Sequence, residues 1–270
     1  MYDSDRIRSE RAERAALADL ARATSPALRR HLGLAVDSVD GALVATAASS
    51  PTSIVVNRAL GLGVERPADP TTVREIVDRY RRAGVERYFV HLDPAAAPAE
   101  LGEWLAREAL EPARAWAKFV RPPEPPPAAT SDLEVRLVDG RHAGDFGRIA
   151  AAAFGLEAPW AEALAGLAGL AEWRVYLSFD GGEPAGCGAL RIHGGTAWFD
   201  WAATRPSHRR RGSQGAILAR RIDDARELGC DLLVTATGVA VPGDPQHSYR
   251  NIERAGFRKS HVRANFAPAA

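Results

Sequence analysis

The residues with the clearest chemical potential form the run R-R-R-G-S-Q-G at positions 209–215. A strand and the turn-forming Pro206 precede the run, and a helix is expected to follow over residues 212–228. The first backbone N–H groups of a helix have no partner within it and lie at the positive end of its dipole. Gly212 and Gly215 let a bulky anion approach this backbone closely, so the run predicts a pyrophosphate site with arginines in reach of further phosphates.

Other meanings of this run stay open on the residues alone. An exposed arginine-rich loop that caps an amphipathic helix would have a similar sequence. The run does not match the Walker A motif, because no Gly-Lys-Ser/Thr follows it. The dinucleotide fingerprint is excluded as well, since the glycine spacing differs and the preceding strand is not the first of its domain. The residues therefore predict phosphate binding without specifying a cofactor.

Composition excludes several classes of partner and site. The 270-residue chain has a net charge of +1, so it has no general attraction for nucleic acid or anionic membranes. Its two cysteines, Cys187 and Cys230, lie apart in apolar stretches, and its seven histidines are scattered, so we expect neither a disulfide framework nor a metal site. The charged N-terminus argues against a secretory signal, and no apolar run approaches the ~20 residues of a membrane span. We expect a cytoplasmic protein.

A proline-rich segment, R-P-P-E-P-P-P-A-A-T-S at residues 121–131, predicts an extended and fairly stiff linker. It separates residues 1–120 from residues 132–270, and each part has the size of an ordinary domain. The first part is expected to begin with a charged helix near residues 4–22. Its other expected elements are a hairpin around Asp40-Gly41, an extended stretch at 53–64, helices at 71–83 and 99–108, and strands at 86–92 and 113–120.

The second part is expected to contain strands and helices in a similar order. The predicted elements are a strand at 133–138, helices at 142–154 and 159–170, strands at 173–179, 185–192 and 197–204, a helix at 212–228, a strand at 231–237, a helix at 246–254, and strands at 257–260 and 261–266. Residues 53–120 and 197–266 repeat one order of elements, which indicates a duplicated fold. Two unrelated α/β units would also alternate in this way.

The 209–215 run resembles motif A of the GNAT superfamily of N-acetyltransferases, [RQ]-x-x-G-x-[GA], which follows a strand and opens a helix. Arg209, Gly212 and Gln214 occupy its three defined positions, with Gln214 in place of the usual Gly or Ala. The segment S-Y-R-N-I-E-R-A-G-F at residues 248–257 resembles the last helix of that family, which ends in a Gly-Phe pair. The order of elements over residues 132–270 also fits.

The resemblance implies an α/β (α+β) fold built from two acyl-CoA N-acyltransferase domains in tandem, with mixed, mostly antiparallel sheets flanked by helices. Residues 132–270 would be the catalytic domain. Residues 1–120 would be a degenerate copy, because Glu65 and Asp69 lie at its equivalent strand-to-helix junction and no arginine run precedes a glycine there. We expect no second coenzyme site in this half, and we expect it to shape the acceptor pocket.

The resemblance also implies the reaction. Acetyl-CoA would be the cosubstrate, no metal would be needed, and a primary amine of a small molecule would attack the thioester directly. The expected coenzyme-binding residues comprise the motif, the end of the preceding strand and the last helix: Ala202, Ala203, Thr204, Arg209, Arg210, Arg211, Gly212, Ser213, Gln214, Gly215, Ser248 and Asn251. Backbone N–H groups of residues 202–204 would stabilise the oxyanion.

Two residues are predicted to be catalytic. Asp200 shares strand parity with Ala202 and lies among aromatic residues, a setting expected to raise the pKa of a carboxylate and suit a general base. Tyr249 is the candidate acid, because Ile252 occupies the position where many family members have a tyrosine. Glu157 could bind the acceptor, and His247 could act as a base, although a surface position would explain either residue.

Two other functions remain open from the sequence. The chain could hold acyl-CoA without turnover, as a sensor or regulatory protein, since the usual tyrosine is missing. A nucleic-acid-binding module built on the three arginines is disfavoured by the near-neutral charge and the lack of interleaved aromatic residues. The expected partners are acetyl-CoA and an amine acceptor, with neither nucleic acid nor membrane, and the chain would be a monomer or a homodimer.

Overall fold

The computed structural model describes residues 2–244 and 247–269. It has a mixed α/β fold in which strands form an open sheet and helices flank it, as the sequence predicts. Residues group into two compact units: one contains the chain up to Ala117 and again from His261 on, and the other is Lys118–Ser260. Across the described residues, no helix has the length and apolar character needed to cross a membrane.

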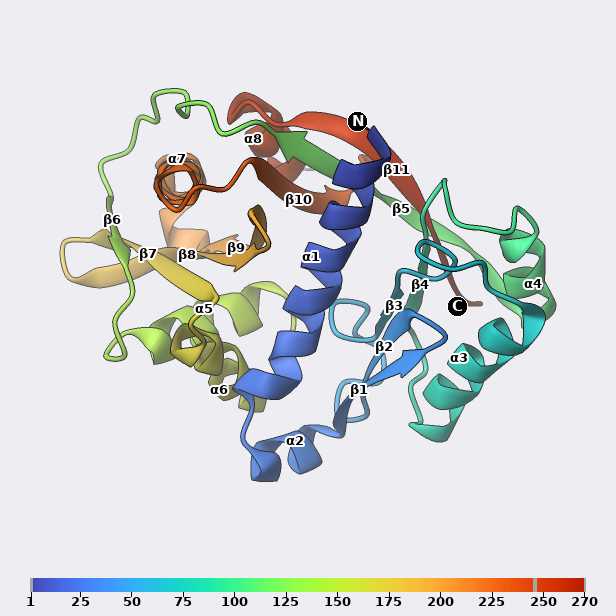
Figure 1. The fold of residues 1–270 in the computed structure, drawn as a ribbon. Helices are drawn as coiled ribbons and strands as arrows, with labels where there is room; N and C mark the ends of the chain where they lie inside the picture. The colour runs from blue at the N-terminus through green and yellow to red at the C-terminus, as the bar shows by residue number, and fades with distance from the viewer. Residues whose placement is uncertain (1, 245–246, 270) are drawn as a thin grey trace. The chain divides into compact units, whose positions relative to one another are not determined.

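The first unit combines both ends of the chain (Figure 1). Its strands lie in the order β1-β2-β3-β4-β11-β5, so the last strand of the chain lies between β4 and β5. Residues Ala264, Asn265 and Phe266 of β11 pair antiparallel with β4. The elements are α1 (Tyr2–Ala23), α2 (Pro26–Leu32), β1 (Leu34–Val39), β2 (Ala42–Ala47), β3 (Arg58–Leu60), α3 (Pro70–Arg82), β4 (Phe89–Leu92), α4 (Leu101–Arg107), β5 (Leu110–Arg121) and β11 (Arg258–Pro268).

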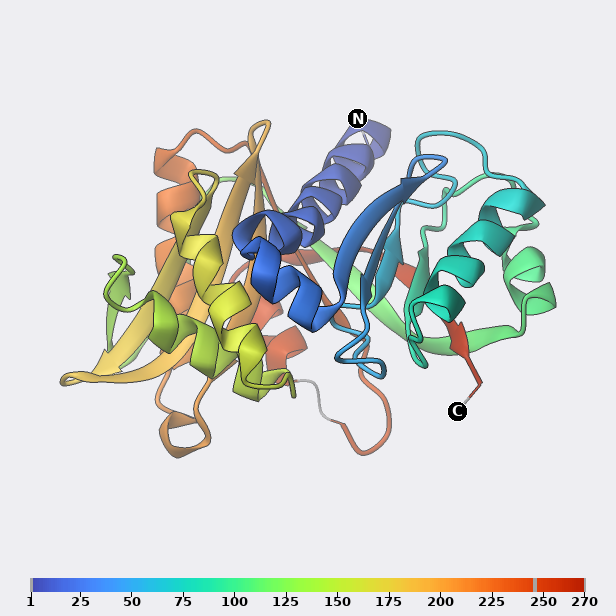
Figure 2. The same cartoon turned by 90° about the horizontal axis from the view of Figure 1, so that it is seen from below.

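The sequence explains why the apolar face of this sheet is covered by α3. Asp69 caps the helix by accepting a hydrogen bond from the Thr72 backbone N–H (2.8 Å), and Pro70 suits the first turn. The buried positions of α3 recur at helical spacing, and they pack with strand residues and α4 into one apolar cluster. Helices α3 and α4 lie on one face of the sheet and α1 on the other (Figure 2).

Charged residues, instead of apolar ones, connect α1 to the strands beneath it. The Arg263 guanidinium on β11 donates to Glu10 (2.9 Å) and Glu13 (3.1 Å) of α1, and all three side chains are buried. Arg58 on β3 also donates to Glu13 (3.1 Å). Because a buried ion is costly unless it is paired, these contacts specify one seating of α1 on the first unit.

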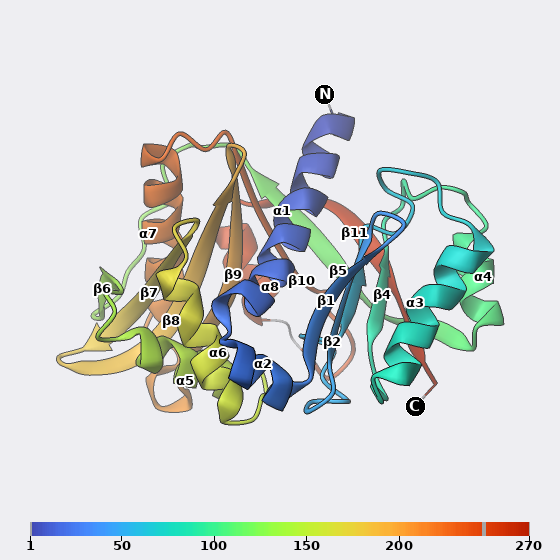
Figure 3. The same cartoon turned by 60° about the horizontal axis from the view of Figure 1, so that its bottom comes forward.

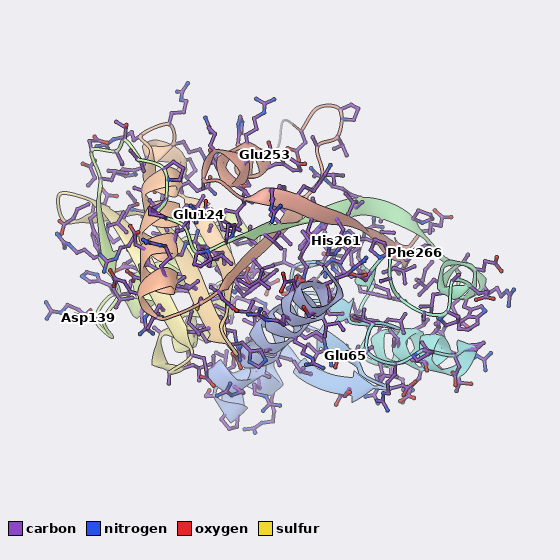
Figure 4. The ribbon with its side chains drawn as sticks, turned by 45° about the horizontal axis from the view of Figure 1, so that its top comes forward. Glu65, Glu124, Asp139, Glu253, His261 and Phe266 are labelled. Atoms are coloured by element: carbon purple, nitrogen blue, oxygen red, sulfur yellow. The ribbon has the colours of Figure 1, made fainter. Side chains whose placement is uncertain are left out.

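A second set of charges lies beside the first, around His261 of β11 (Figure 4). The partner of His261 is Asp93. The His261 Nε2 and Asp93 Oδ2 atoms are 3.1 Å apart, and Arg6 contacts the other Asp93 oxygen at 2.5 Å. Burial alone would raise the pKa of Asp93. Hydrogen bonds from His261, the Ala95 backbone N–H and Arg6 outweigh that cost and hold the pKa well below its usual range.

The second unit has strand order β5-β10-β9-β8-β7-β6. Helix α7 lies on one face of these strands, and α5 and α6 lie on the other (Figure 3). The elements are β6 (Glu134–Leu137), α5 (Ala143–Ala153), α6 (Pro159–Ala165), the short 3-10 turn η1 (Gly166–Gly169), β7 (Trp173–Asp180), β8 (Glu183–His193), β9 (Thr196–Thr204), η2 (Pro206–His208), α7 (Ser213–Glu227), β10 (Leu232–Gly238) and α8 (His247–Arg254).

Most predicted elements are confirmed, with four corrections. The extended stretch predicted at 53–64 contains only the short strand β3, and turns make up most of the rest. The two closing strands predicted at 257–260 and 261–266 are one continuous strand, β11. The helix predicted at 159–170 ends at Ala165 and continues as the turn η1, and the helix α2 was not predicted. Gln246, the predicted first residue of the last helix, lies outside the described residues. The predicted domain boundaries remain a proposal; by contacts, the chain from His261 on belongs with its N-terminal part.

The buried charge network predicts a large effect of one substitution. Arg263→Met leaves Glu10 and Glu13 buried without their shared cation, so the free energy of unfolding should fall by about 3–5 kcal/mol. Urea denaturation measures this change. The matched control is Arg107→Met, whose exposed partner Glu103 lies 3.6 Å away; it should cost no more than about 0.5 kcal/mol. Equal effects of the two substitutions would contradict the network.

Asp93 predicts a pH dependence of stability. Its pKa is lowered in the folded state, so it contributes stability above its unfolded value of about 3.9, and this contribution is lost as the pH falls toward its folded pKa. The difference in unfolding free energy between the natural protein and Asp93→Asn should therefore be largest near neutral pH and should shrink below about pH 4. A constant difference from pH 7 to pH 3 would show that ionisation of Asp93 does not matter.

Candidate functional site

The strands β9 and β10 separate near the middle of β9. Their parallel pairing covers only Thr196–Trp198 of β9 and Leu232–Val234 of β10. Beyond it, β9 continues to Thr204 and β10 to Gly238, and the described ladder contains no further pair between them. Backbone groups at an open edge of this kind need partners from elsewhere, so the gap can receive an extended ligand.

A β-bulge lies on β9 just beyond the last pair. Trp201 has a φ of +47°, in the left-handed region that a bulky residue rarely adopts, and the register with β8 shifts between Cys187 and Ala189. The bulge reverses which way the next side chain faces. The Phe199 ring lies under Arg221 of α7, whereas the Trp201 ring contacts Phe154 at the end of α5.

The predicted phosphate loop leads from β9 into α7. Gly212 is the N-cap with a φ of +79°, and it provides no side chain to satisfy the first N–H groups of the helix. Arg209 and Arg210 are exposed, and the described residues contain no ion-pair partner for either one. The loop therefore presents helix N–H groups beside two available guanidinium groups.

The third arginine has a different environment. Arg211 binds Asp180 (2.5 Å) and also Asp132, which follows the proline-rich segment. The hydrogen bonds that Arg211 donates, first to Asp180 and then to Asp132, raise its pKa. A phosphate could recruit this side chain only by displacing both carboxylates, so Arg211 holds the loop in place. The sequence does not predict either partner, because Asp180 lies 31 residues and Asp132 lies 79 residues before Arg211, with no local signal for the contacts.

The end of the proline-rich segment crosses the loop at Gly212. A Cβ atom at this position would lie 2.1 Å from the Thr130 carbonyl oxygen, so only glycine fits there. The Ser131 hydroxyl donates to the Arg211 carbonyl oxygen (2.8 Å). The segment predicted to be a linker therefore also fixes one side of the loop.

Three further predicted coenzyme residues make contacts within the protein. Ser213 is buried, and its hydroxyl lies 2.8 Å from that of Ser178 on β7, so its side chain faces the sheet. Gln214 accepts a hydrogen bond from the Asn251 side-chain amide, which joins the start of α7 to α8. This contact gives the atypical residue of the motif a structural role.

The two predicted catalytic side chains lie in different environments. Asp200 accepts hydrogen bonds from the Trp198 indole N–H and the Trp201 backbone N–H, both at 2.9 Å. Tyr249 of α8 packs edge-to-face on Phe119, with ring centroids 4.8 Å apart. It borders a hollow of about 500 Å³ whose polar walls include Asp244, Arg250 and Glu253.

The other predicted residues are placed as follows. Ala202 and Thr204 are half-buried and Ala203 is buried on the part of β9 that β10 does not cover, and Ser248 is half-buried on α8. Glu157 and His247 are exposed, as a surface role would require.

Cys187 has the position but not the properties of a nucleophile. It is fully buried, and its thiol donates to the Trp201 carbonyl oxygen (3.4 Å). Burial raises the pKa of this thiol to about 12, so it stays protonated near neutral pH. The second cysteine, Cys230, is also buried and unbridged.

One group of side chains in the first unit has the spacing of a metal site. Single ligand atoms of Glu10, Asp93 and His261 lie within 4.8 Å of one another. Each carboxylate already contacts a guanidinium: Glu10 that of Arg263, and Asp93 that of Arg6. A divalent cation would have to enter beside these two positive charges, which makes the group a poor metal site.

Comparisons with known proteins agree with this geometry. Residues 148–257 match the family model described as the Acetyltransferase (GNAT) family. No curated protein matches the chain. The solved GCN5-related N-acetyltransferase from Kribbella flavida aligns with a TM-score of 0.64 at 18% identity, covering 97% of this chain and 96% of that one. The solved GCN5-related N-acetyltransferase from Sphaerobacter thermophilus aligns with a TM-score of 0.61 at 17% identity. The alignment covers 96% of this chain and 91% of that one.

A third similar structure is a tandem GNAT protein from the clavulanic acid biosynthesis pathway, solved without AcCoA. Its TM-score is 0.55 at 14% identity, and the alignment covers 84% of this chain and 77% of that one. At these identities the likeness concerns the fold, and here it extends over both parts of the chain.

The crossing at Gly212 predicts a steric penalty. Gly212→Ala incurs the strain of a positive φ and places a methyl group against the Thr130 carbonyl. The matched control is Gly155→Ala, where φ is +65° but a Cβ would meet nothing within 4 Å. The control should cost about 1–2 kcal/mol of unfolding free energy, and Gly212→Ala should cost about 1–3 kcal/mol more. Equal losses would show that the segment does not press on the loop.

Proposed function

We propose that this chain, whose residues 148–257 carry a domain of the acetyltransferase (GNAT) family, transfers an acetyl group from acetyl-CoA to a primary amine of a small molecule. The family supports an acyltransferase; the acetyl donor, the amine and its size are the proposal. Residues 132–270 would form the catalytic domain and residues 1–120 a degenerate copy. The reaction needs no metal, and the protein would act in the cytoplasm.

The observation that carries the proposal is a helix N-terminus without a side-chain cap beside two exposed arginines that have no ion-pair partner among the described residues. The N–H groups that follow Gly212 suit the pyrophosphate of the coenzyme, and Arg209 and Arg210 can reach its charged oxygens. The gap between β9 and β10 begins after Trp198, on the strand that leads into this loop, and would receive the pantetheine arm. Both features belong to the same compact unit.

The uncovered part of β9 supplies candidates for the oxyanion donors. Ala202, Ala203 and Thr204 follow the bulge, on the part of β9 that β10 does not pair with. Their small side chains would let a thioester approach the backbone, and a fixed N–H group directed at the carbonyl oxygen would stabilise the charge that develops there.

Direct attack by the amine fits the chemistry of the available nucleophiles. A covalent route through an acyl-cysteine would need a reactive thiolate, and the thiol of Cys187 is buried with its pKa raised to about 12. The amine would therefore attack the thioester carbon itself. The C–S bond breaks, coenzyme A leaves as a thiolate, and the amine nitrogen loses one proton.

A sensor that binds acyl-CoA without turnover is the second candidate, because the usual tyrosine position is occupied by Ile252, which is buried. The two functions differ in free-thiol release. Acetyl-CoA should raise the melting temperature in both cases, but only an enzyme should release coenzyme A with some member of a panel of primary amines. Stabilisation without release across the panel would favour the sensor, and no stabilisation would refute coenzyme binding.

The loop predicts the effect of its arginines on affinity. Arg209→Ala and Arg210→Ala should each weaken acetyl-CoA binding roughly tenfold, the equivalent of one charge-assisted hydrogen bond, and should lessen the dependence of the dissociation constant on salt. Isothermal titration calorimetry measures both effects. Arg205→Ala is the matched control, because this exposed side chain is held by Glu183 at 2.6 Å. Unchanged affinity in both loop variants would remove the pyrophosphate assignment.

A further inference from the structure

We propose that Asp200 is a positioning residue that holds the β9 bulge in its catalytic shape, and that Trp198 and Lys118 hold Asp200 in turn. The catalytic part of this inference rests on the proposed function. It replaces the role of general base that the sequence favours for Asp200. It also gives Trp198 a specific role and adds Lys118, which the sequence did not associate with the site.

The contacts of Asp200 carry the inference. One carboxylate oxygen accepts the N–H of Trp201 (2.9 Å), the residue whose φ of +47° defines the bulge. The other oxygen accepts the indole N–H of Trp198 (2.9 Å), two residues back on the same strand. The Asp200 side chain thus links Trp198 to Trp201. A left-handed residue in a strand persists only when such contacts enforce its conformation.

Trp198 is itself held by a buried cation. The ammonium group of Lys118, which is fully buried at the end of β5, lies 4.9 Å from the centre of the Trp198 ring. A cation over an indole face is attracted to the ring, and the attraction is stronger away from water. The ammonium also draws electron density from the ring, so the indole N–H becomes a better donor to Asp200. Lys118, Trp198 and Asp200 all belong to the second unit.

Two other side chains secure the carbonyl groups of the bulge. Arg221 of α7 donates to the carbonyl oxygens of Ala189 (2.8 Å) and Asp200 (3.3 Å), and Cys187 donates to that of Trp201. Arg221 is completely buried. Side chains therefore hold the carbonyl groups of residues 200 and 201. In the next stretch Ala203 and Thr204 stay paired with β8, so the backbone groups there that face away from β8 are the ones left to meet a ligand in the gap.

The same contacts argue against Asp200 as the base. A general base must reach the proton that it removes, within about 2.6–3.2 Å or through one water. Both carboxylate oxygens of Asp200 already accept hydrogen bonds from the protein, and both donors belong to the same strand, β9. Moving it toward an amine would release the Trp201 N–H and the bulge together.

Two variants separate the roles by kinetics. In Asp200→Asn the amide oxygen can still accept the Trp201 N–H, but the side chain cannot remove a proton; Asp200→Ala can do neither. Positioning predicts that the Asn variant keeps kcat within about tenfold of the natural protein with the same pH profile, while the Ala variant loses more than that with the KM for acetyl-CoA little changed. If both variants lose about 10²–10⁴-fold and the acidic limb of the pH profile disappears, Asp200 is the base and the inference is wrong.

Hydrogen exchange tests the clamp without any turnover. The Trp201 amide should exchange faster in Asp200→Ala than in Asp200→Asn, while amides elsewhere in β8 show that the fold is intact. Trp198→Phe keeps a ring beneath Lys118 but removes the donor, so it should also accelerate exchange at Trp201. Trp173→Phe, the same change at a buried position of β7, is the control and should not.

The two proposals fail in different ways. If the natural protein releases no thiol with any amine, the acyl-transfer proposal fails, and the exchange measurement still decides whether Asp200 clamps the bulge. If thiol release is seen but Trp201 exchange is the same in all variants, the clamp is refuted and the acyl-transfer proposal stands.

Discussion

The departure of β9 from β10 after Trp198 is the constraint on which the arrangement of the site depends. A strand that loses its neighbour exposes backbone donors and acceptors that must find other partners. On this chain the Phe199 carbonyl oxygen accepts a hydrogen bond from the Thr235 hydroxyl, Asp200 and Arg221 satisfy the groups that follow, and the chain forms the bulge at Trp201. Beyond the bulge, β9 stays paired with β8 at Ala203 and Thr204, so the backbone groups that face away from β8 are the ones that could meet a ligand in the gap.

The arginine loop shows how similar residues in a row acquire different roles. Arg209 and Arg210 lie in solvent, whereas Arg211 is neutralised by Asp132 and Asp180. A flexible cationic loop would lose entropy on binding an anion. The pairing of Arg211, together with the segment that crosses Gly212, fixes the loop in advance, so that less of this entropy would be lost when the proposed coenzyme binds.

The first unit uses buried charge for a structural purpose. Its sheet has an apolar face beneath α3, but Glu10 and Glu13 of α1 meet Arg58 and Arg263 on the other. Ion pairs of this kind add little net stability over apolar packing, although losing one partner is costly. These ion pairs do favour one position of α1 on the sheet over others, because a shifted helix would leave buried charges unpaired. The last strand of the chain supplies Arg263, so this unit is complete only when both ends of the chain are present.

The sequence by itself determined the order of elements, the α/β class and the loop at residues 209–215, because periodicity, caps and glycine spacing are local properties. It could not determine that the two final strands would be one, or that β11 would pair with β4, since strand partners are chosen by contacts far apart in the chain. It assigned Asp200 by strand parity, and a bulge interrupts that parity. Arg211 looks identical to its neighbours in sequence; only tertiary structure, by bringing Asp132 and Asp180 beside it, decided its role.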